Sequence, residues 1–199
     1  MVTTVGLSYK INDDGTAYAV AGIGTATDTD IVIPSTYNGL PVTSIGEAAF
    51  QNCDGLTEIT IPDSVTGIGS YAFQNCDGLT EITIPDSVTS IGDGAFFGCS
   101  GLKSITVEAG NSVYHSSGNC LIQTGSKTLI AGCKNSVIPT DSSVTGIGND
   151  AFSGCSGLTS ITIPDSVTGI GEWAFFECSG LTSITLPDSV TSIGECAFA

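Results

Sequence analysis

A motif that recurs at a constant interval along this 199-residue chain constrains its fold more than any other feature. The run Val-Thr-x-Ile-Gly begins at six positions, which are Val42, Val65, Val88, Val144, Val167 and Val190. Neighbouring copies follow one another at the same spacing, except that a much longer gap separates the third copy from the fourth. The period is about 23 residues, and a fixed period of about 20–50 residues is typical of solenoids, in which each unit packs on its neighbours.

The first half of each unit has the pattern of a short strand. In one full copy, Leu56, Ile59 and Ile61 follow the Leu-x-x-Leu-x-Leu spacing of leucine-rich repeats. Side chains two residues apart lie on one face of a strand, so Ile59 and Ile61 are expected in the core. Pro62 ends the strand, because proline cannot donate a hydrogen bond to a sheet. About seven such rungs are expected, ending on Ile33, Ile61, Ile84, Val107, Ile138, Ile163 and Leu186.

The second half of the unit is expected to complete a coil. Val65 and Ile68 return to the core from the opposite wall, and Gly69 permits a tight bend. Ala72, with the phenylalanine and cysteine that follow it, is interpreted as part of a short helical or 3₁₀ segment packing inward. One unit buries too little apolar surface to offset the entropy of ordering its backbone, so units must stack. The sequence predicts a leucine-rich-repeat solenoid, mostly β-structure with short helical or 3₁₀ turns.

Both ends of the chain depart from the regular unit. Residues 1–30 alternate apolar and polar positions on either side of Asp14-Gly15, which predicts an N-terminal β-hairpin cap. Residues 31–199 are expected to form a single continuous solenoid domain with that cap. The last unit stops at Ala199, before its Cys-x-Gly turn. We therefore expect a C-terminus truncated from a longer array, or an open end covered by end-to-end self-association.

An insert at about residues 111–134 accounts for the long gap between the third and fourth copies. Two apolar runs, at 120–123 and 127–130, flank Thr124-Gly125-Ser126. This pattern predicts a second hairpin, which either projects from the solenoid or extends its side. Insertions on one face of a repeat array are often binding sites.

Charge excludes some classes of partner. Four lysines and arginines against twenty acidic residues give a net charge of -16, which disfavours nucleic acids and anionic membranes. No apolar run reaches the roughly 18 residues that cross a bilayer, so no membrane insertion is expected. The first residues lack the pattern of a signal peptide.

The complete unit resembles the BspA-type leucine-rich repeats, also called the Treponema pallidum class. The resemblance rests on Leu-Thr-Glu-Ile-Thr-Ile-Pro-Asp-Ser-Val-Thr-x-Ile-Gly-x-x-Ala-Phe-x-x-Cys-x-Gly and extends to the lead-in at 30–42 and the insert at 119–134. Proteins of that family are mostly surface or secreted proteins of anaerobic and host-associated bacteria and of some parasitic protists. The resemblance implies adhesion or extracellular recognition. It implies no catalytic residue set and no particular ligand.

Five of the eight cysteines share one repeat position, and we expect them to form an inward stack of reduced thiols. These are Cys53, Cys76, Cys99, Cys155 and Cys178. They occur once per repeat, which does not match the closely spaced ligand pairs of a zinc site. Cys120 and Cys133 flank the insert hairpin and are the pair that a disulfide would join, while Cys196 falls outside the stack.

Two sets of polar residues recur along the repeat, and we prefer a structural interpretation for both. Aspartates recur after proline at Asp63, Asp86, Asp165 and Asp188. They suit turns, and the repeat lacks the glycine-rich pattern of calcium-binding β-rolls, so no metal or other cofactor is expected. The outward strand positions include Glu58, Thr60, Glu81 and Thr83. Threonine suits an exposed strand, but this face remains a natural docking surface of a solenoid.

One position inside the repeat varies freely and holds Ala48, Tyr71, Gly94, Asp150, Trp173 and Cys196. Such variation indicates that the core does not dictate this residue. Tyr71 and Trp173, with Phe97 and Phe176 nearby, are therefore candidates for exposed aromatic contacts. The alternative is incidental packing against the neighbouring coil.

Catalysis has little support in the sequence. His115 is the only histidine, is placed in a loop of the insert, and has no second base or metal cluster beside it. We keep it only as a candidate surface contact. The leading hypothesis is a non-catalytic recognition or adhesion module, on the cell surface or secreted, that binds a protein or glycan. The alternative is a structural spacer or display scaffold within a larger exported protein.

Overall fold

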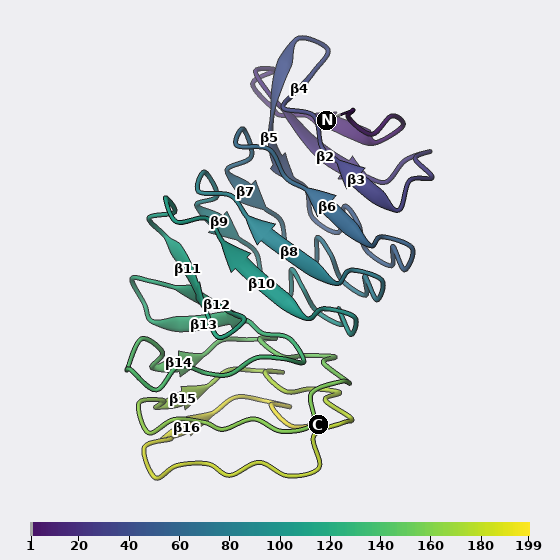
Figure 1. Ribbon diagram of the computed structural model, residues 1–199. Helices are drawn as coiled ribbons and strands as arrows, with labels where there is room; N and C mark the ends of the chain where they lie inside the picture. The colour runs from purple at the N-terminus through teal and green to yellow at the C-terminus, as the bar shows by residue number, and fades with distance from the viewer. Residues whose placement is uncertain (1) are drawn as a thin grey trace.

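The computed structural model describes residues 2–199 and has the form of a β-solenoid, in which coil follows coil from one end to the other (Figure 1). The N-terminal cap is the antiparallel pair β1 (Ser8–Ile11) and β2 (Tyr18–Gly22). β2 continues in parallel with β5 (Leu40–Ile45), the first strand of the regular stack. A short strand β4 (Thr36–Tyr37) folds back on β5. The expected hairpin is therefore present and covers the first coil.

Each coil has two walls. The first wall contains β3 (Asp30–Val32), β6 (Glu58–Thr60), β8 (Glu81–Ile84) and β10 (Ser104–Val107), which pair in parallel as β3–β6 and β8–β10. The second wall contains β5, β7 (Gly67–Ile68) and β9 (Ser90–Ile91), and beyond the insert β14 (Gly146–Ile147), β15 (Gly169–Ile170) and β16 (Ser192–Ile193). Equivalent residues face each other in the ladder, as Ile68 faces Ile91. This register follows directly from the repeat.

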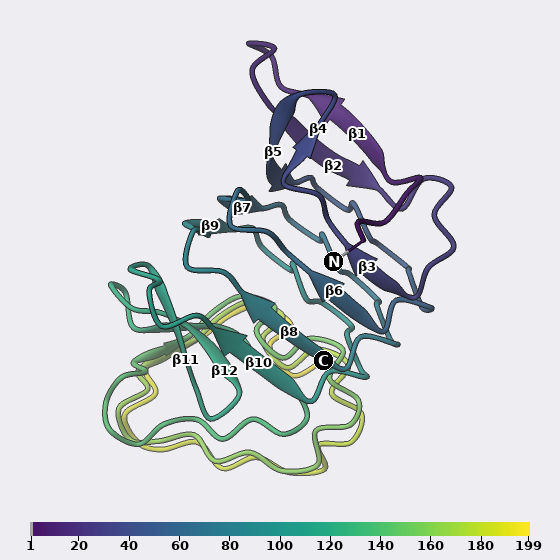
Figure 2. The ribbon, with the colours of Figure 1, turned by 45° about the horizontal axis from the view of Figure 1, so that its top comes forward.

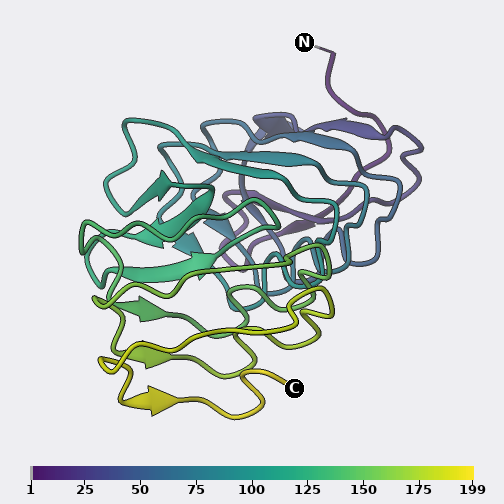
Figure 3. The ribbon, with the colours of Figure 1, turned by 60° about the horizontal axis from the view of Figure 1, so that its bottom comes forward.

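The last three rungs expected on the first wall are extended but form no hydrogen-bonded ladder. On the second wall the same coils stay tightly joined, since Thr168 N–H donates to Thr145 O and Thr191 N–H to Thr168 O, both at 2.9 Å. On the first wall a gap of about 390 Å³ separates Ile163 from the next coil. In Figure 3 each of the three lowest coils has a short strand on the second wall and none on the first. The expectation of paired strands there is wrong, because the coils diverge beyond hydrogen-bonding distance.

The expected helical or 3₁₀ segments are instead series of tight turns, and no helix occurs among residues 2–199. Amide groups in these turns alternate between two directions. Gln74 N–H donates within its own coil to Tyr71 O at 3.0 Å, whereas Phe73 N–H donates to Ala95 O of the next coil at 2.8 Å. The variable position opens the turn in a left-handed conformation, with φ of 52° at Ala48, 57° at Tyr71 and 58° at Trp173. A helix cannot continue through such a residue.

This backbone conformation predicts opposite effects at two adjacent alanines. Ala48 has positive φ, which is unfavourable for any residue with a Cβ, so Ala48→Gly should raise the free energy of unfolding by roughly 0.5–1 kcal/mol. Ala49 is buried with negative φ, so Ala49→Gly should lower it by at least about 1 kcal/mol. Urea unfolding of both variants measures the difference, and the same sign for the two would contradict this assignment.

The insert forms three strands, β11 (Tyr114–Ser117), β12 (Cys120–Gln123) and β13 (Thr128–Ala131), in an antiparallel meander. β13 pairs in parallel with β14, so the insert extends the second wall. The hairpin of β12 and β13 is the one that the sequence predicts, while β11 is an additional strand. Of the two placements considered, extension of the solenoid's side is the one observed.

β12 divides the interior into two cores. Leu121 packs with the N-terminal core, while its neighbours Cys120 and Ile122 pack with the C-terminal core, and all three side chains are fully buried. Successive side chains of a strand point to opposite faces, so a strand buried on both faces serves as a wall between the cores. We call this strand the septum. The solenoid axis bends here, because Figure 2 shows the C-terminal coils end-on and the N-terminal coils obliquely.

Equivalent core phenylalanines stack within each half. Phe73 lies between Phe50 and Phe96, with ring centroids 5.6 Å and 5.5 Å away and nearly parallel planes. Phe152 stacks on Phe175 at 5.0 Å in the other half. Each coil therefore aligns its ring on that of its neighbour.

Candidate binding surface

The turns that follow the second wall form one edge of the solenoid, and this edge carries the aromatic residues singled out in the sequence. We call it the turn edge, defined by the variable position and the position three residues after it. Tyr71 is 39% exposed and Trp173 37% exposed. The ring of Tyr71 covers Gly94 of the next coil, where a Cβ would meet it. Tyr71 is thus partly exposed and also packs on the neighbouring coil. The two alternatives for this position, an exposed aromatic contact and packing between coils, each describe part of its role.

Three of the aromatic residues come together. Trp173 meets Phe176 edge-on with ring centroids 4.6 Å apart, and Phe176 lies 6.5 Å from Phe97. Phe97 and Phe176 are two coils apart and lie in the column of Ser153, which is 1% exposed and whose Oγ has no hydrogen-bond partner among the described residues. Trp173, Phe176 and Phe97 form a partly exposed aromatic cluster, which the sequence suggested residue by residue but could not assemble.

Glu58, Thr60, Glu81 and Thr83 lie on β6 and β8 of the first wall, a different part of each coil. Their alternation with buried isoleucines places them outward, as expected. Thr83 Oγ1 lies 3.5 Å from Thr106 Oγ1, so these two threonines hydrogen-bond along the wall. The two sets of predicted residues therefore belong to separate surfaces.

His115 is a strand residue, which corrects its assignment to a loop. It pairs with Ile122 in the β11–β12 ladder, and its Nδ1 lies 2.9 Å from Thr124 Oγ1. The strand was missed because Tyr114–Ser117 contains only one strongly apolar residue. His115 lies on the insert, and no contact joins it to the aromatic cluster.

A second aromatic group on the cap was not expected. Tyr9 and Tyr37 stack with centroids 3.9 Å apart, and Tyr18 meets Tyr37 edge-on at 5.0 Å. Burial and the neighbouring Tyr37 raise the pKa of Tyr9. The strand alternation placed Tyr9 and Tyr18 on one hairpin, but Tyr37 joins them only through β4. These contacts hold β4 against the cap.

All eight cysteines are free thiols. In the inward stack, Cys76 Sγ donates to Phe50 O and Cys99 Sγ to Phe73 O, each at 3.0 Å. Burial raises the pKa of Cys76 and of Cys120 to about 12 and that of Cys178 to about 11. Four of the five cysteines expected in the inward stack are buried, whereas Cys53 is partly exposed, and the disulfide considered for Cys120 and Cys133 is not formed.

These environments predict which thiols react. At pH 8 a thiol with a pKa of about 12 is a thiolate in roughly one molecule in 10⁴, so the buried cysteines should react slowly with an aromatic disulfide reagent. Cys53 and Cys196, the two partly exposed thiols, should react first. After denaturation without reductant all eight should titrate. Fewer than eight would reveal a disulfide and contradict the assignment.

The post-proline aspartates do not converge. No group of three or more histidine, cysteine, aspartate or glutamate side chains is placed to hold a metal ion within residues 2–199. Their neighbouring serines instead join the coils, as Ser87 Oγ donates to Val65 O at 2.7 Å and Ser166 Oγ to Val144 O at 2.7 Å. The Pro-Asp-Ser element therefore has a structural role.

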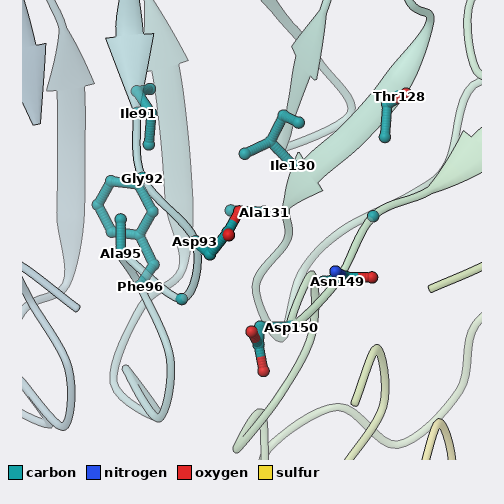
Figure 4. Close-up of a pocket in the computed structure, with 12 residues that line it drawn as sticks. Ile91, Gly92, Asp93, Ala95, Phe96, Thr128, Ile130, Ala131, Asn149 and Asp150 are labelled. Atoms are coloured by element: carbon teal, nitrogen blue, oxygen red, sulfur yellow. The ribbon is translucent and has the colours of Figure 1, made fainter. Parts of the chain in front are cut away.

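A cavity beside β13, the strand that pairs with the septum, is the main feature that sequence reasoning missed, and we call it the septum cavity. It has a volume of about 260 Å³ and lies between the coil of β9 and the coils of β13 and β14 (Figure 4). Its lining includes Ile91, Phe96 and Ile130, with the carboxylates of Asp93 and Asp150. Burial raises the pKa of Asp150, and the neighbouring carboxylates of Asp93 and Glu172 raise it further. No sequence signal places these coils side by side, because the insert separates them.

Comparisons with known proteins agree with this architecture. A family model described as the BspA type leucine rich repeat region matches six copies, over residues 26–142 and 123–199. The comparison with curated proteins found no match. None of the described residues form a helix long and apolar enough to cross a membrane.

Several solved structures are similar to this chain. A leucine rich cell surface protein of Faecalibacterium prausnitzii is 23% identical, with a TM-score of 0.52, over 100% of this chain and 79% of that chain. The T. pallidum leucine rich repeat protein is 25% identical, with a TM-score of 0.51, over 95% and 83% respectively. The pneumococcal vaccine antigen PcpA is 20% identical, with a TM-score of 0.60, over 94% and 62%. Since the repeat, the coils and the family match agree across almost the whole chain, the protein belongs to the family of BspA-type leucine-rich-repeat proteins.

Proposed function

We propose that this chain is a non-catalytic recognition module that binds a protein or glycan at a bacterial cell surface, through its turn edge. The observation that carries the proposal is the cluster of Trp173, Phe176 and Phe97, partly exposed on a rigid, repeated backbone. Exposed aromatic side chains on rigid elements are typical binding hot spots, because they bury a large area at a small entropy cost.

The family supports the location and the class of function. One similar structure is described as a cell surface protein and another as a vaccine antigen. An acidic surface, with a net charge of -16, favours basic or neutral ligands over nucleic acids. A rigid solenoid offers a long surface for such contacts.

A screen of the purified chain against glycan and extracellular-matrix protein arrays tests the proposal. A ligand found in this way should bind at least about 30-fold more weakly to Trp173→Ala and Phe176→Ala variants. Tyr37→Ala is the matched control, because Tyr37 is equally exposed but lies on the cap. Equal loss in the control, or no loss in either cluster variant, would overturn the turn edge as the binding surface. Finding no ligand at all would favour a structural spacer.

A further inference from the structure

The septum cavity differs from the spaces between other coils in its backbone hydrogen bonds. Elsewhere the amide of the variable position donates to the next coil, as Tyr71 N–H donates to Asp93 O at 3.1 Å and Asp150 N–H to Glu172 O at 3.0 Å. The equivalent amide of Gly94 has no acceptor within residues 2–199. By the same register the acceptor of Gly94 N–H would be Asn149 O, but the insert lies between the two coils. Its Gly132 N–H takes Ala151 O at 2.7 Å, the acceptor that the register would give to Phe96 N–H.

A second amide is left free in the same place. Phe73 N–H donates to Ala95 O, and Phe152 N–H to Ala174 O at 2.7 Å, but Phe96 N–H donates to no described residue. Gly94 and Phe96 are both buried, and both line the cavity. Buried amides without partners are rare in proteins, so two that flank one cavity indicate that an acceptor belongs there.

The charge around the cavity is one-sided. Asp93 comes from the turn after β9 and Asp150 from the turn after β14, so carboxylates enter from both coils (Figure 4). Glu172 lies close enough to raise the pKa of Asp150 further. No lysine or arginine is among the lining residues. The cavity thus lacks the positive charge that would stabilise its carboxylates.

Aromatic and apolar groups complete the surroundings. Phe96 is the one aromatic residue among those that line the cavity. Ile91 and Ile130 line the cavity itself, lie toward the same part of it and are labelled in Figure 4. An occupant therefore meets free amide donors, carboxylates, apolar side chains and the aromatic residue Phe96 together.

We propose that the septum cavity binds an arginine side chain of an extended segment of a partner protein, with the segment's backbone carbonyl accepting from Gly94 and Phe96. A guanidinium group suits two carboxylates because it donates in several directions in one plane, and it stacks on aromatic rings. The volume of about 260 Å³ fits one long side chain and its backbone. The inference deepens the proposed function and rests on it, since it names the chemical class of the ligand.

An NMR titration of the full chain tests this without knowledge of the natural partner. The probe is N-acetyl-arginine methylamide, and the control is the citrulline compound, which has the same shape without charge. The arginine compound should shift the amide signals of Gly94, Phe96 and Asp150, and the citrulline compound should bind at least about 10-fold more weakly. Equal binding of the two would overturn the proposal, and so would shifts centred outside the cavity.

Two charge-matched variants locate the effect. Asp150→Asn should weaken binding of the arginine compound about 10-fold, and it should fold, because asparagine tolerates the φ of 56° at this position. Asp165→Asn removes the same charge from the opposite side of a coil and should leave binding unchanged. Methylguanidinium binding as tightly as the full probe would overturn the role of Gly94 and Phe96. Failure of this titration leaves the screen with Trp173 unaffected, so the two failures are distinguishable.

Discussion

Replacing Phe73 by alanine is expected to lower the free energy of unfolding by about 3–5 kcal/mol. Phe73 is completely buried and stacks on Phe50 and Phe96 in the coils on either side. Its removal takes away a large apolar surface and leaves a cavity that the two flanking rings are too constrained to fill. The effect should reach beyond one coil, because the ring contributes to two inter-coil interfaces.

Phe198→Ala is the control for this variant. Phe198 occupies the equivalent position and stacks on Phe175 at 5.3 Å, but it is 41% exposed and has one stacking neighbour. Phe198→Ala should lower the free energy of unfolding by less than about half as much as Phe73→Ala does. Urea unfolding followed by circular dichroism measures both. Similar losses for the two variants would show that stacking between coils does not set the stability.

Gly132→Ala is expected to destabilise the protein by about 1–3 kcal/mol. A Cβ at Gly132 would overlap the ring of Phe152, which is completely buried and packed on Phe175. The ring has no free space to enter, so the chain after β13 must move away from it. That movement would weaken the bond from Gly132 N–H to Ala151 O, which ties the insert to the C-terminal coils.

Gly125→Ala is the control, because it makes the same substitution at a glycine with free space around it. Gly125 lies in the turn of the same hairpin, and a Cβ there meets nothing within 4 Å. This variant should change the free energy of unfolding by less than about 0.5 kcal/mol. Thermal melts of both proteins give the comparison, and equal melting temperatures would refute the close packing at Gly132.

The regular coils could be predicted from the sequence because several signals in each repeat indicate the same structure. Spacing, strand breakers and apolar positions all repeat, so Ile59 and Ile61 are found facing inward where expected. The hairpin cap followed from local alternation and a turn signal. These features depend on contacts within one coil or between identical neighbours, which a repeat encodes directly.

The turn conformation could not be predicted in the same way. Alanine, tyrosine and tryptophan disfavour positive φ, yet Ala48, Tyr71 and Trp173 all have it. Only Gly94 and Asp150 among the six residues at this position have a type that tolerates it readily. All six residues at this position share the conformation, so it belongs to the turn and not to the residue type, and the residue types alone do not indicate it.

The candidate site depended on contacts across the insert. Phe97 and Phe176 come within 6.5 Å because Gly98 N–H bonds to Ser153 O, which rejoins coils separated by the insert. The run Cys-Leu-Ile of β12 fits a one-sided hairpin and a strand buried on both faces equally well. The septum, its cavity and the assembled aromatic cluster therefore required the three-dimensional arrangement.

The septum also determines how this molecule responds to a pulling force. A force along the solenoid axis acts on every interface between coils. The interface with the fewest hydrogen bonds therefore separates first. At the septum Gly94 and Phe96 contribute no bond to the next coil, whereas the equivalent residues elsewhere in the interior of the stack do. Most of each apolar core lies on one side of such a break, although Leu121 of the insert packs with the N-terminal core. A solenoid stretched between two surfaces would extend at the septum while most of its coils stay folded.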